Sequence, residues 1–168
     1  MPYSGKMLTP YQQKISKQVT SGKFRWFLFS QLPMGLIAGL RVVKLTEEQC
    51  ITSVPYKWLT KNPFQSMYFA VQSMAAELST ASTCMLATAG EKPSVAFIIV
   101  DLKASFYKKA TDKVYFTCEN ASDAFKAVEA CKETREAATA TFKTVGKMPD
   151  GTVVSEFEFA WSFKQRKS

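Results

Sequence analysis

The sequence predicts a single α+β domain in which a sheet wraps around one long helix. Helix-type and strand-type segments are mixed through all 168 residues with no linker between them, which favours one shared core. Residues 62–90 have a helical pattern and a single charged side chain, Glu77. A helix that is uncharged nearly all round is typical of the centre of a domain, and we expect a sheet to surround this one.

Two short helices and a strand pair are predicted before the central helix. The second helix should stop before Pro33, because the residue before a proline disfavours the helical conformation. Gly35 and Gly39 then indicate extended structure, and Pro55 favours an edge position or a bulge for the second strand. The expected elements are helices over 9–21 and 23–32, followed by strands over 37–46 and 49–58 joined by a turn at Glu47 and Glu48.

The central helix is predicted to begin at Asn62-Pro63. Asparagine caps a helix and proline supplies a preset φ in the first turn, so the helix should cover residues 64–84. A strand over residues 94–108 follows, and it contains the uninterrupted apolar run AFIIV. That run predicts a central strand buried on both faces.

The last third of the chain predicts a helix between strand hairpins. A hairpin through residues 110–112 should lead to a strand over residues 113–119, and residues 120–132 should form a helix. Residues 136–145 and 152–164 should form a closing hairpin around a Pro-Asp-Gly loop. Large aromatic side chains alternate with small or acidic ones in the last strand, which predicts a half-buried strand. These aromatic residues are Phe157, Phe159, Trp161 and Phe163.

The formal charge of +8 is concentrated at the ends of the chain. This pattern fits contact with nucleic acid or an anionic membrane, attraction of a polyanionic small molecule such as a coenzyme A derivative, or an ordinary solvated surface. Because the chain has no recognition-helix or ribonucleoprotein motif, we expect no nucleic-acid partner. The terminal basic residues are Lys6, Lys14, Lys17, Lys23, Arg25, Lys164, Arg166 and Lys167.

The apolar run from Trp26 to Leu40 is 15 residues long and is interrupted by Gln31 and Pro33. It is too short to span a bilayer and lies too far along the chain for an ordinary signal peptide. An interfacial helix is one interpretation, and packing across the domain is the other. We favour packing, so membrane contact by the N-terminal segment is not expected.

The chain contains no histidine, which excludes Ser-His-Asp and Cys-His catalysis within it. Its four cysteines are widely spaced and include no CxxC pair. This pattern argues against a zinc site, and no metal is expected. It also argues against a disulfide framework, so reduced thiols in a cytoplasmic protein are the expectation.

Glu77 is the first candidate functional residue. If the central helix is buried, the ionised carboxylate is costly and its pKa should rise. A carboxylate of that kind suits general-base catalysis. The alternative is an ordinary glutamate on an exposed helix face, because glutamate is a good helix former.

The segment from Asn62 to Thr80 resembles the signature of the phenylacetyl-CoA-type hot-dog thioesterases. That family carries an asparagine at the entrance to the central helix and an acidic residue 15 positions later, and Asn62 and Glu77 match them. Residues 100–110, VDLKASFYKKA, are similar to the family's next strand. The resemblance spans about residues 36–120 and implies one hot-dog domain, 1–168, with a curved antiparallel sheet.

The resemblance also implies an activity and a set of site residues. Residues 1–34 would be a helical extension to the domain. The protein would be an acyl-CoA thioesterase that needs no cofactor and takes a thioester of coenzyme A or acyl carrier protein as substrate. Glu77 would be the general base or nucleophile, and Asn62 would orient the water or the carbonyl unless it is a plain helix cap.

Further residues complete the implied site. The family usually has a His-Gly or Gly-Gly step at positions that Tyr68 and Phe69 occupy here, and their backbone amides would stabilise the oxyanion. The remaining candidates are side chains that would orient Glu77, line the acyl site or bind phosphates. They are Ser73, Met74 and Thr80 on the helix and Lys108 and Lys109 after the following strand. Asp101 is a second, weaker candidate carboxylate.

If Asn62 and Glu77 serve one site, as the resemblance implies, helix geometry predicts a homodimer. Fifteen helical residues would separate Asn62 from Glu77 by about 20 Å, so one thioester could reach both only if they came from different chains. A two-fold dimer, or a dimer of such dimers, would carry shared sites. The alternative function is a non-catalytic hot-dog dimer that binds acyl-CoA or a fatty acid, which the bulk of Tyr68 and Phe69 favours.

Overall fold

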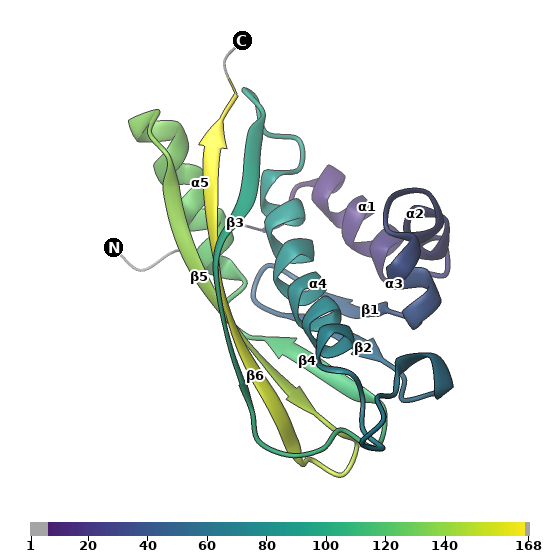
Figure 1. Cartoon of the computed structure of the whole chain (residues 1–168). Helices are drawn as coiled ribbons and strands as arrows, with labels where there is room; N and C mark the ends of the chain where they lie inside the picture. Colours follow the sequence, from purple (N-terminus) through teal and green to yellow (C-terminus); the bar gives the residue numbers. More distant parts are fainter. Residues whose placement is uncertain (1–6, 167–168) are drawn as a thin grey trace.

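The computed structural model describes residues 7–166, so Lys6 and Lys167 lie outside the described residues. A curved six-stranded antiparallel sheet, in the order β1-β2-β4-β5-β6-β3, holds the long helix α4 against its concave face (Figure 1). The strands are β1 (Arg41–Leu45), β2 (Cys50–Val54), β3 (Val95–Phe106), β4 (Val114–Cys118), β5 (Ala138–Lys147) and β6 (Val153–Gln165). The helices are α1 (Pro10–Val19), α2 (Phe24–Gln31), α3 (Pro33–Ala38), the 3₁₀ helix η1 (Trp58–Thr60), α4 (Phe69–Thr88) and α5 (Ser122–Thr134).

The core lies between α4 and the concave face of the sheet. Small residues such as Ala75 and Ala76 are completely buried on α4, and they allow the helix to approach the strands closely. The Thr52 hydroxyl of β2 donates to the Ala75 carbonyl over 2.6 Å. The predicted aromatic face of β6 is confirmed, because all four of its aromatic side chains are buried.

The central helix begins later than predicted. Asn62 does not cap it, because its side-chain oxygen accepts from the amides of Phe64 and Ser66 over 3.0 and 3.3 Å. These bonds close a tight turn instead of opening a helix. The Asn62 amide also donates to the Ser66 carbonyl. The N-cap is Tyr68, whose side chain makes no capping bond.

The segment after Pro33 is helical rather than extended. Pro33 occupies the first turn of α3, where its missing N–H costs nothing. Gly39 then ends the helix with a φ of 84°, a left-handed conformation that glycine adopts readily. The prediction of a strand from residue 37 was therefore wrong, and β1 begins only at Arg41.

β3 is an edge strand, although its apolar run predicted a central one. It pairs with β6 alone, and β4 pairs with β2 and β5. The predicted hairpin through residues 110–112 is therefore also wrong. Ile98 and Val100 are 65% and 56% exposed. A continuous apolar run indicates burial, but nothing within residues 7–166 covers this one.

Gly146 allows β5 to pass over a core phenylalanine. A Cβ atom added there would lie 2.5 Å from the ring of Phe116, which is fully buried. Because the ring cannot move without disturbing the core, we expect Gly146→Ala to lower the free energy of unfolding by about 2–3 kcal/mol. Urea denaturation would measure the loss.

Gly22→Ala is the matched control for this experiment. A Cβ atom at Gly22 would have no neighbour within 4 Å, so the free energy of unfolding should change by less than about 0.5 kcal/mol. Equal stability of the Gly146→Ala protein and the wild type would contradict the packing around Phe116.

Candidate functional site

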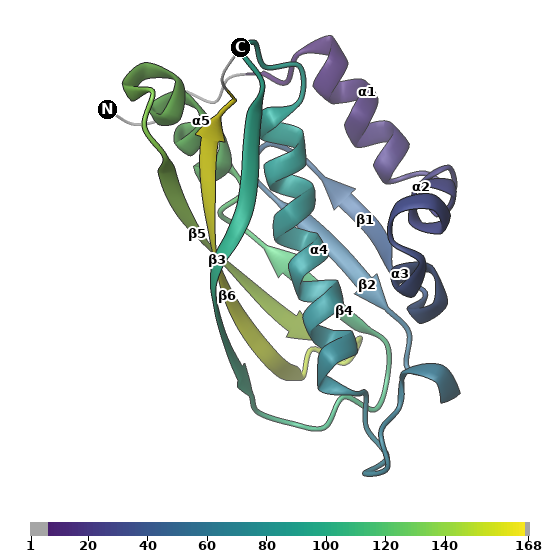
Figure 2. The same cartoon turned by 45° about the horizontal axis from the view of Figure 1, so that its top comes forward.

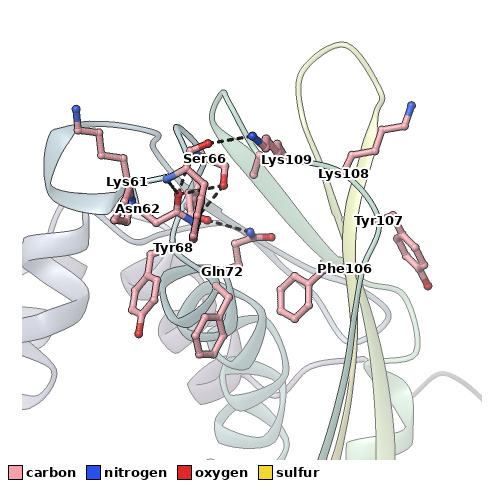
Figure 3. A pocket seen from close by; sticks show the side chains of 14 residues that line it. Lys61, Asn62, Ser66, Tyr68, Gln72, Phe106, Tyr107, Lys108 and Lys109 are labelled. Atoms are coloured by element: carbon pink, nitrogen blue, oxygen red, sulfur yellow. Dashed lines mark hydrogen bonds between the residues drawn. The ribbon is translucent and has the colours of Figure 1, made fainter.

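A pocket of 670 Å³ opens at the N-terminal end of α4. Three segments build it: the loop over residues 61–67, the first turn of α4, and the end of β3 with the residues up to Ala110 (Figure 3). The Met67 amide donates to the Ala110 carbonyl over 2.7 Å, which ties the first and third segments together. The turn closed by Asn62 is therefore a structural wall of the pocket.

The first turn of α4, where Phe69 lines the pocket, has free backbone donors. The Tyr68 amide is not one of them, because it donates to the Thr60 carbonyl over 2.8 Å. The amides of Phe69 and Ala70 have no hydrogen-bond partner within residues 7–166. Unpaired amides at a helix N-terminus, reinforced by the helix dipole, bind an anion or a polarised carbonyl oxygen. The predicted donor pair therefore moves one residue along, to Phe69 and Ala70.

Aromatic rings stand around these amides. The Tyr68 and Phe69 rings meet edge to face with centroids 4.9 Å apart. Phe69 also meets Phe106 of β3 edge to face at 6.3 Å. About half of each of these three side chains is exposed, so the rings form an apolar lining open to a ligand.

Asn62 keeps one donor for a ligand. Its amide nitrogen donates to the Ser66 hydroxyl over 3.1 Å, and an asparagine amide group carries two N–H donors. The side chain is half-buried and lines the pocket. The turn therefore holds the side chain in place, and its second N–H has no partner within residues 7–166.

Gln72 is a pocket residue that the sequence interpretation missed. Its side chain is 4% exposed, accepts from the Ser155 hydroxyl of β6 over 2.7 Å and donates to the Met67 carbonyl over 3.4 Å. It links α4, the sheet and the loop behind the pocket. The available signal was the one amide side chain in residues 69–88, one turn after the start of the helix.

Three lysines surround the mouth of the pocket. Lys61 and Lys108 extend from opposite sides of it (Figure 3). The Lys109 ammonium donates to the Phe64 carbonyl over 3.1 Å. The predicted Lys108 and Lys109 thus lie at the pocket, and Lys61 is an addition from the loop.

Glu77 lies outside this pocket. It is eight residues after Phe69 on the same helix, which corresponds to about 12 Å along the axis. The side chain is half-buried, and burial raises the pKa of its carboxyl from 4.5 to about 7. The premise of one continuous helix from Asn62 to Glu77 was wrong, but Glu77 and the pocket of its own chain are still separate.

The predicted helpers of Glu77 are bonded elsewhere. The Ser73 hydroxyl donates to the Phe69 carbonyl over 3.0 Å. The Thr80 hydroxyl donates to the Glu77 backbone carbonyl and accepts from the Trp161 indole N–H, each over 3.0 Å. Within residues 7–166 the Glu77 carboxylate has no hydrogen-bond partner, which agrees with its raised pKa.

The remaining candidates are scattered. Met74 is half-buried on α4 beyond the pocket. Asp101 is exposed at a bulge in β3, where it accepts from the Leu102 amide.

No group of three or more cysteine, aspartate or glutamate side chains within residues 7–166 is placed to hold a metal ion. No helix in that same range is long and apolar enough to cross a membrane.

Searches for related proteins found matches only among solved structures. No family model and no curated protein matches the chain. A Pseudomonas aeruginosa protein of unknown function, described as a probable thioesterase, is 18% identical and superposes with a TM-score of 0.72 over 96% of this chain and 100% of its own. A Chlorobaculum tepidum protein of unknown function is 14% identical, with a TM-score of 0.75 over 95% and 98%.

A thioesterase from Staphylococcus aureus is also similar. It is 12% identical and superposes with a TM-score of 0.60 over 79% of this chain and 98% of its own. It was solved as two variants, one with a glutamine and one with a glutamate replaced by alanine, at positions fifteen residues apart. The predicted architecture is confirmed: this chain has the hot-dog fold, as its thioesterase neighbours do.

Proposed function

We propose that the protein is a thioester hydrolase that acts on acyl-CoA, with Glu77 as its base or nucleophile. The observation that carries the proposal is a half-buried carboxylate on the central helix, without a hydrogen-bond partner within residues 7–166 and with a pKa of about 7. A base with a pKa near neutral pH is suited to activating water. The fifteen-residue spacing of Asn62 and Glu77, equal to that of the two residues replaced in the Staphylococcus aureus thioesterase, supports the choice.

The active unit of this proposal is a two-fold dimer. In a single chain the inner face of β3 is only partly covered, because Ile99, Leu102 and Phe106 are 37%, 49% and 48% exposed. Ile99 and Leu102 are paired with the core residues Trp161 and Phe159, so they lie on the same side of the sheet as α4. A second copy pairing along β3 would cover this face and bring Glu77 of one protomer toward the pocket of the other.

In that shared site, Glu77 removes a proton from water as the water oxygen attacks the thioester carbonyl carbon. The developing oxyanion accepts hydrogen bonds from the amides of Phe69 and Ala70. The carbon–sulfur bond then breaks, and the proton held by Glu77 passes to the leaving thiolate. The products are a carboxylic acid and a free thiol. Direct attack by Glu77, with an anhydride intermediate that water opens, gives the same products.

The lysines at the pocket mouth support coenzyme A as the carrier of the acyl group. Coenzyme A carries several phosphate charges, and Lys61 and Lys108 extend from the rim where such a group would pass. Acyl carrier protein presents only one phosphate, so the three lysines favour coenzyme A. The proposal places the enzyme in the cytoplasm, which the four free, buried cysteines support.

A non-catalytic dimer that binds acyl-CoA or a fatty acid is the second candidate. The rings of Tyr68 and Phe69 favour it, because they stand beside the amides that must approach a carbonyl oxygen. This function would give saturable ligand binding with no thiol release, and Glu77→Gln would leave the binding unchanged.

Thiol release from short, medium, long and aromatic acyl-CoAs tests the proposed function. We expect turnover with at least one of these chain types. Binding without turnover on every substrate would assign the second candidate function instead.

The phosphate contacts are tested with a double variant, Lys61→Ala/Lys108→Ala. Removing two charges that contact the carrier should raise KM for acyl-CoA about tenfold with little change in kcat. The matched substrate is the same acyl group on N-acetylcysteamine, which has no phosphate, and its KM should not change. An equal change for both substrates would contradict phosphate binding at the rim.

A further inference from the structure

α2 is apolar on both of its faces. Phe24 and Leu28 are buried, one turn apart, and anchor the helix to the domain. Trp26 and Phe29 lie on the outer face, 76% and 65% exposed, with their rings in edge-to-face contact. The outer face of a surface helix is normally polar, so these two aromatic residues need another explanation.

α3 also exposes apolar side chains. Its buried residues are Gly35 and Ala38, whereas Met34 and Ile37 are 61% and 50% exposed. The two helices pack against each other on either side of Leu32. Trp26, Phe29, Met34 and Ile37 are called the α2–α3 apolar surface below. Exposed large apolar side chains gathered on neighbouring elements mark an interaction site.

The segment that carries this surface has only positive charges. Residues 7–46 contain six basic side chains and no acidic one. Lys14, Lys17 and Lys23 line one groove of 450 Å³ along α1. Lys23 also lines a neighbouring groove of 350 Å³ with Phe27 of α2, so this lysine connects the basic groove of α1 to the aromatic helix.

The proposed dimer would not cover the α2–α3 apolar surface. β3 and β1 are the two opposite edges of the sheet, and α1 contacts β1. In both views α1, α2 and α3 lie on one side of α4 and β3 lies on the other (Figure 2). A partner paired along β3 therefore leaves the aromatic side chains of α2 in water.

We propose that the α2–α3 apolar surface, with the lysines of α1, docks the protein on an anionic lipid bilayer. Tryptophan and phenylalanine partition into the headgroup region, and basic side chains are attracted to anionic lipids. The absence of acidic residues suits such a surface, which would repel them. The expectation from sequence that the run from Trp26 to Leu40 packs within the domain holds for its buried residues, Leu28, Gly35, Ala38 and Leu40, and not for the α2–α3 apolar surface.

Vesicle co-sedimentation tests the proposal. The wild type should bind vesicles of phosphatidylcholine with about 30% phosphatidylserine. Binding should weaken at least tenfold when salt is raised from about 0.05 M to about 0.5 M. Equal binding to pure phosphatidylcholine vesicles, or no binding to the anionic vesicles, would overturn the proposal.

Variants assign the contact to residues. Trp26→Ser/Phe29→Ser should lower the affinity for anionic vesicles at least tenfold, as should Lys14→Gln/Lys17→Gln. All four side chains are exposed, so the fold should survive, and circular dichroism checks it.

The control is Phe64→Ser, which removes a phenylalanine that is 73% exposed in the pocket loop. This variant should bind vesicles as the wild type does. An equal loss of vesicle binding in the control would show non-specific hydrophobic adsorption instead. Conversion of a dimer to a monomer by Trp26→Ser/Phe29→Ser, measured by light scattering, would show that the surface is a contact between protein chains.

Discussion

Glu77→Gln is expected to lower kcat for acyl-CoA hydrolysis about 1,000-fold, with little change in KM. Glutamine has nearly the same shape but cannot take a proton or attack a carbonyl, and loss of a general base costs two to four orders of magnitude. In the wild type, kcat should rise with pH and level off above about pH 7, because the carboxyl must be ionised. Initial rates from pH 5 to pH 9 would measure both effects.

The same substitution should stabilise the protein at high pH. Burial raises the pKa of Glu77 from 4.5 to about 7, so between these values the folded state binds more protons than the unfolded state. Wild-type stability therefore falls as the pH rises from about 4.5 to about 7. Glutamine has no charge to desolvate, and at pH 8 the variant should be more stable by about 2 kcal/mol.

Denaturation at two pH values separates the cost of burying the ionised Glu77 carboxylate from effects that do not depend on its charge. At pH 4 wild type and Glu77→Gln should unfold alike, and at pH 8 the variant should be the more stable. Glu136→Gln, at an exposed position before β5, is the matched control and should change neither rate nor stability. A Glu77→Gln protein with wild-type turnover would refute the assignment of the base.

Leu102→Asp is expected to convert the dimer into a monomer and to abolish turnover. Leu102 is 49% exposed on the inner face of β3, so a single chain tolerates the charge. In the dimer the two carboxylates would be buried near the two-fold axis without partners, and we expect the dimer dissociation constant to rise at least about 1,000-fold. Light scattering after size exclusion would measure the mass.

Val43→Asp is the control at the opposite edge of the sheet. Val43 lies on β1 and is 50% exposed, so the change in charge and exposure is matched. The protein should remain a dimer with full turnover. Dissociation by Val43→Asp and not by Leu102→Asp would move the interface to β1 and remove the proposed shared site.

Mixed dimers test whether one site takes residues from two chains. Glu77→Gln and Lys61→Ala/Lys108→Ala damage different parts of the site, because Glu77 lies on α4 and the two lysines lie at the pocket beyond the N-terminal end of that helix. If the site is shared, a mixed dimer carries one intact site and one with both defects. At acyl-CoA concentrations below KM, an equal mixture should recover about one quarter of wild-type turnover. Turnover no greater than the sum of the separate variants would show that each site lies within one chain.

Local patterns in the sequence determined much of the fold. The alternation of Phe157, Phe159, Trp161 and Phe163 identified β6 and its buried face, because the side-chain period of a strand is two. The uncharged stretch from Asn62 identified the buried central helix, and the lone charge within it singled out Glu77. These features depend on residues close together in the chain, so the sequence alone can predict them.

Only the tertiary structure decided which strands are neighbours and which donors stay free. The apolar run in β3 indicated burial, but its place at the sheet edge depends on pairing with β6, some 60 residues later. Asn62 has the pattern of a helix cap, yet its bonds to Phe64 and Ser66 close a turn. The Tyr68 amide donates to the Thr60 carbonyl, which leaves the amides of Phe69 and Ala70 as free donors. Propensity describes what a segment can form by itself, whereas pairing and hydrogen-bond competition depend on partners that only the folded chain brings near.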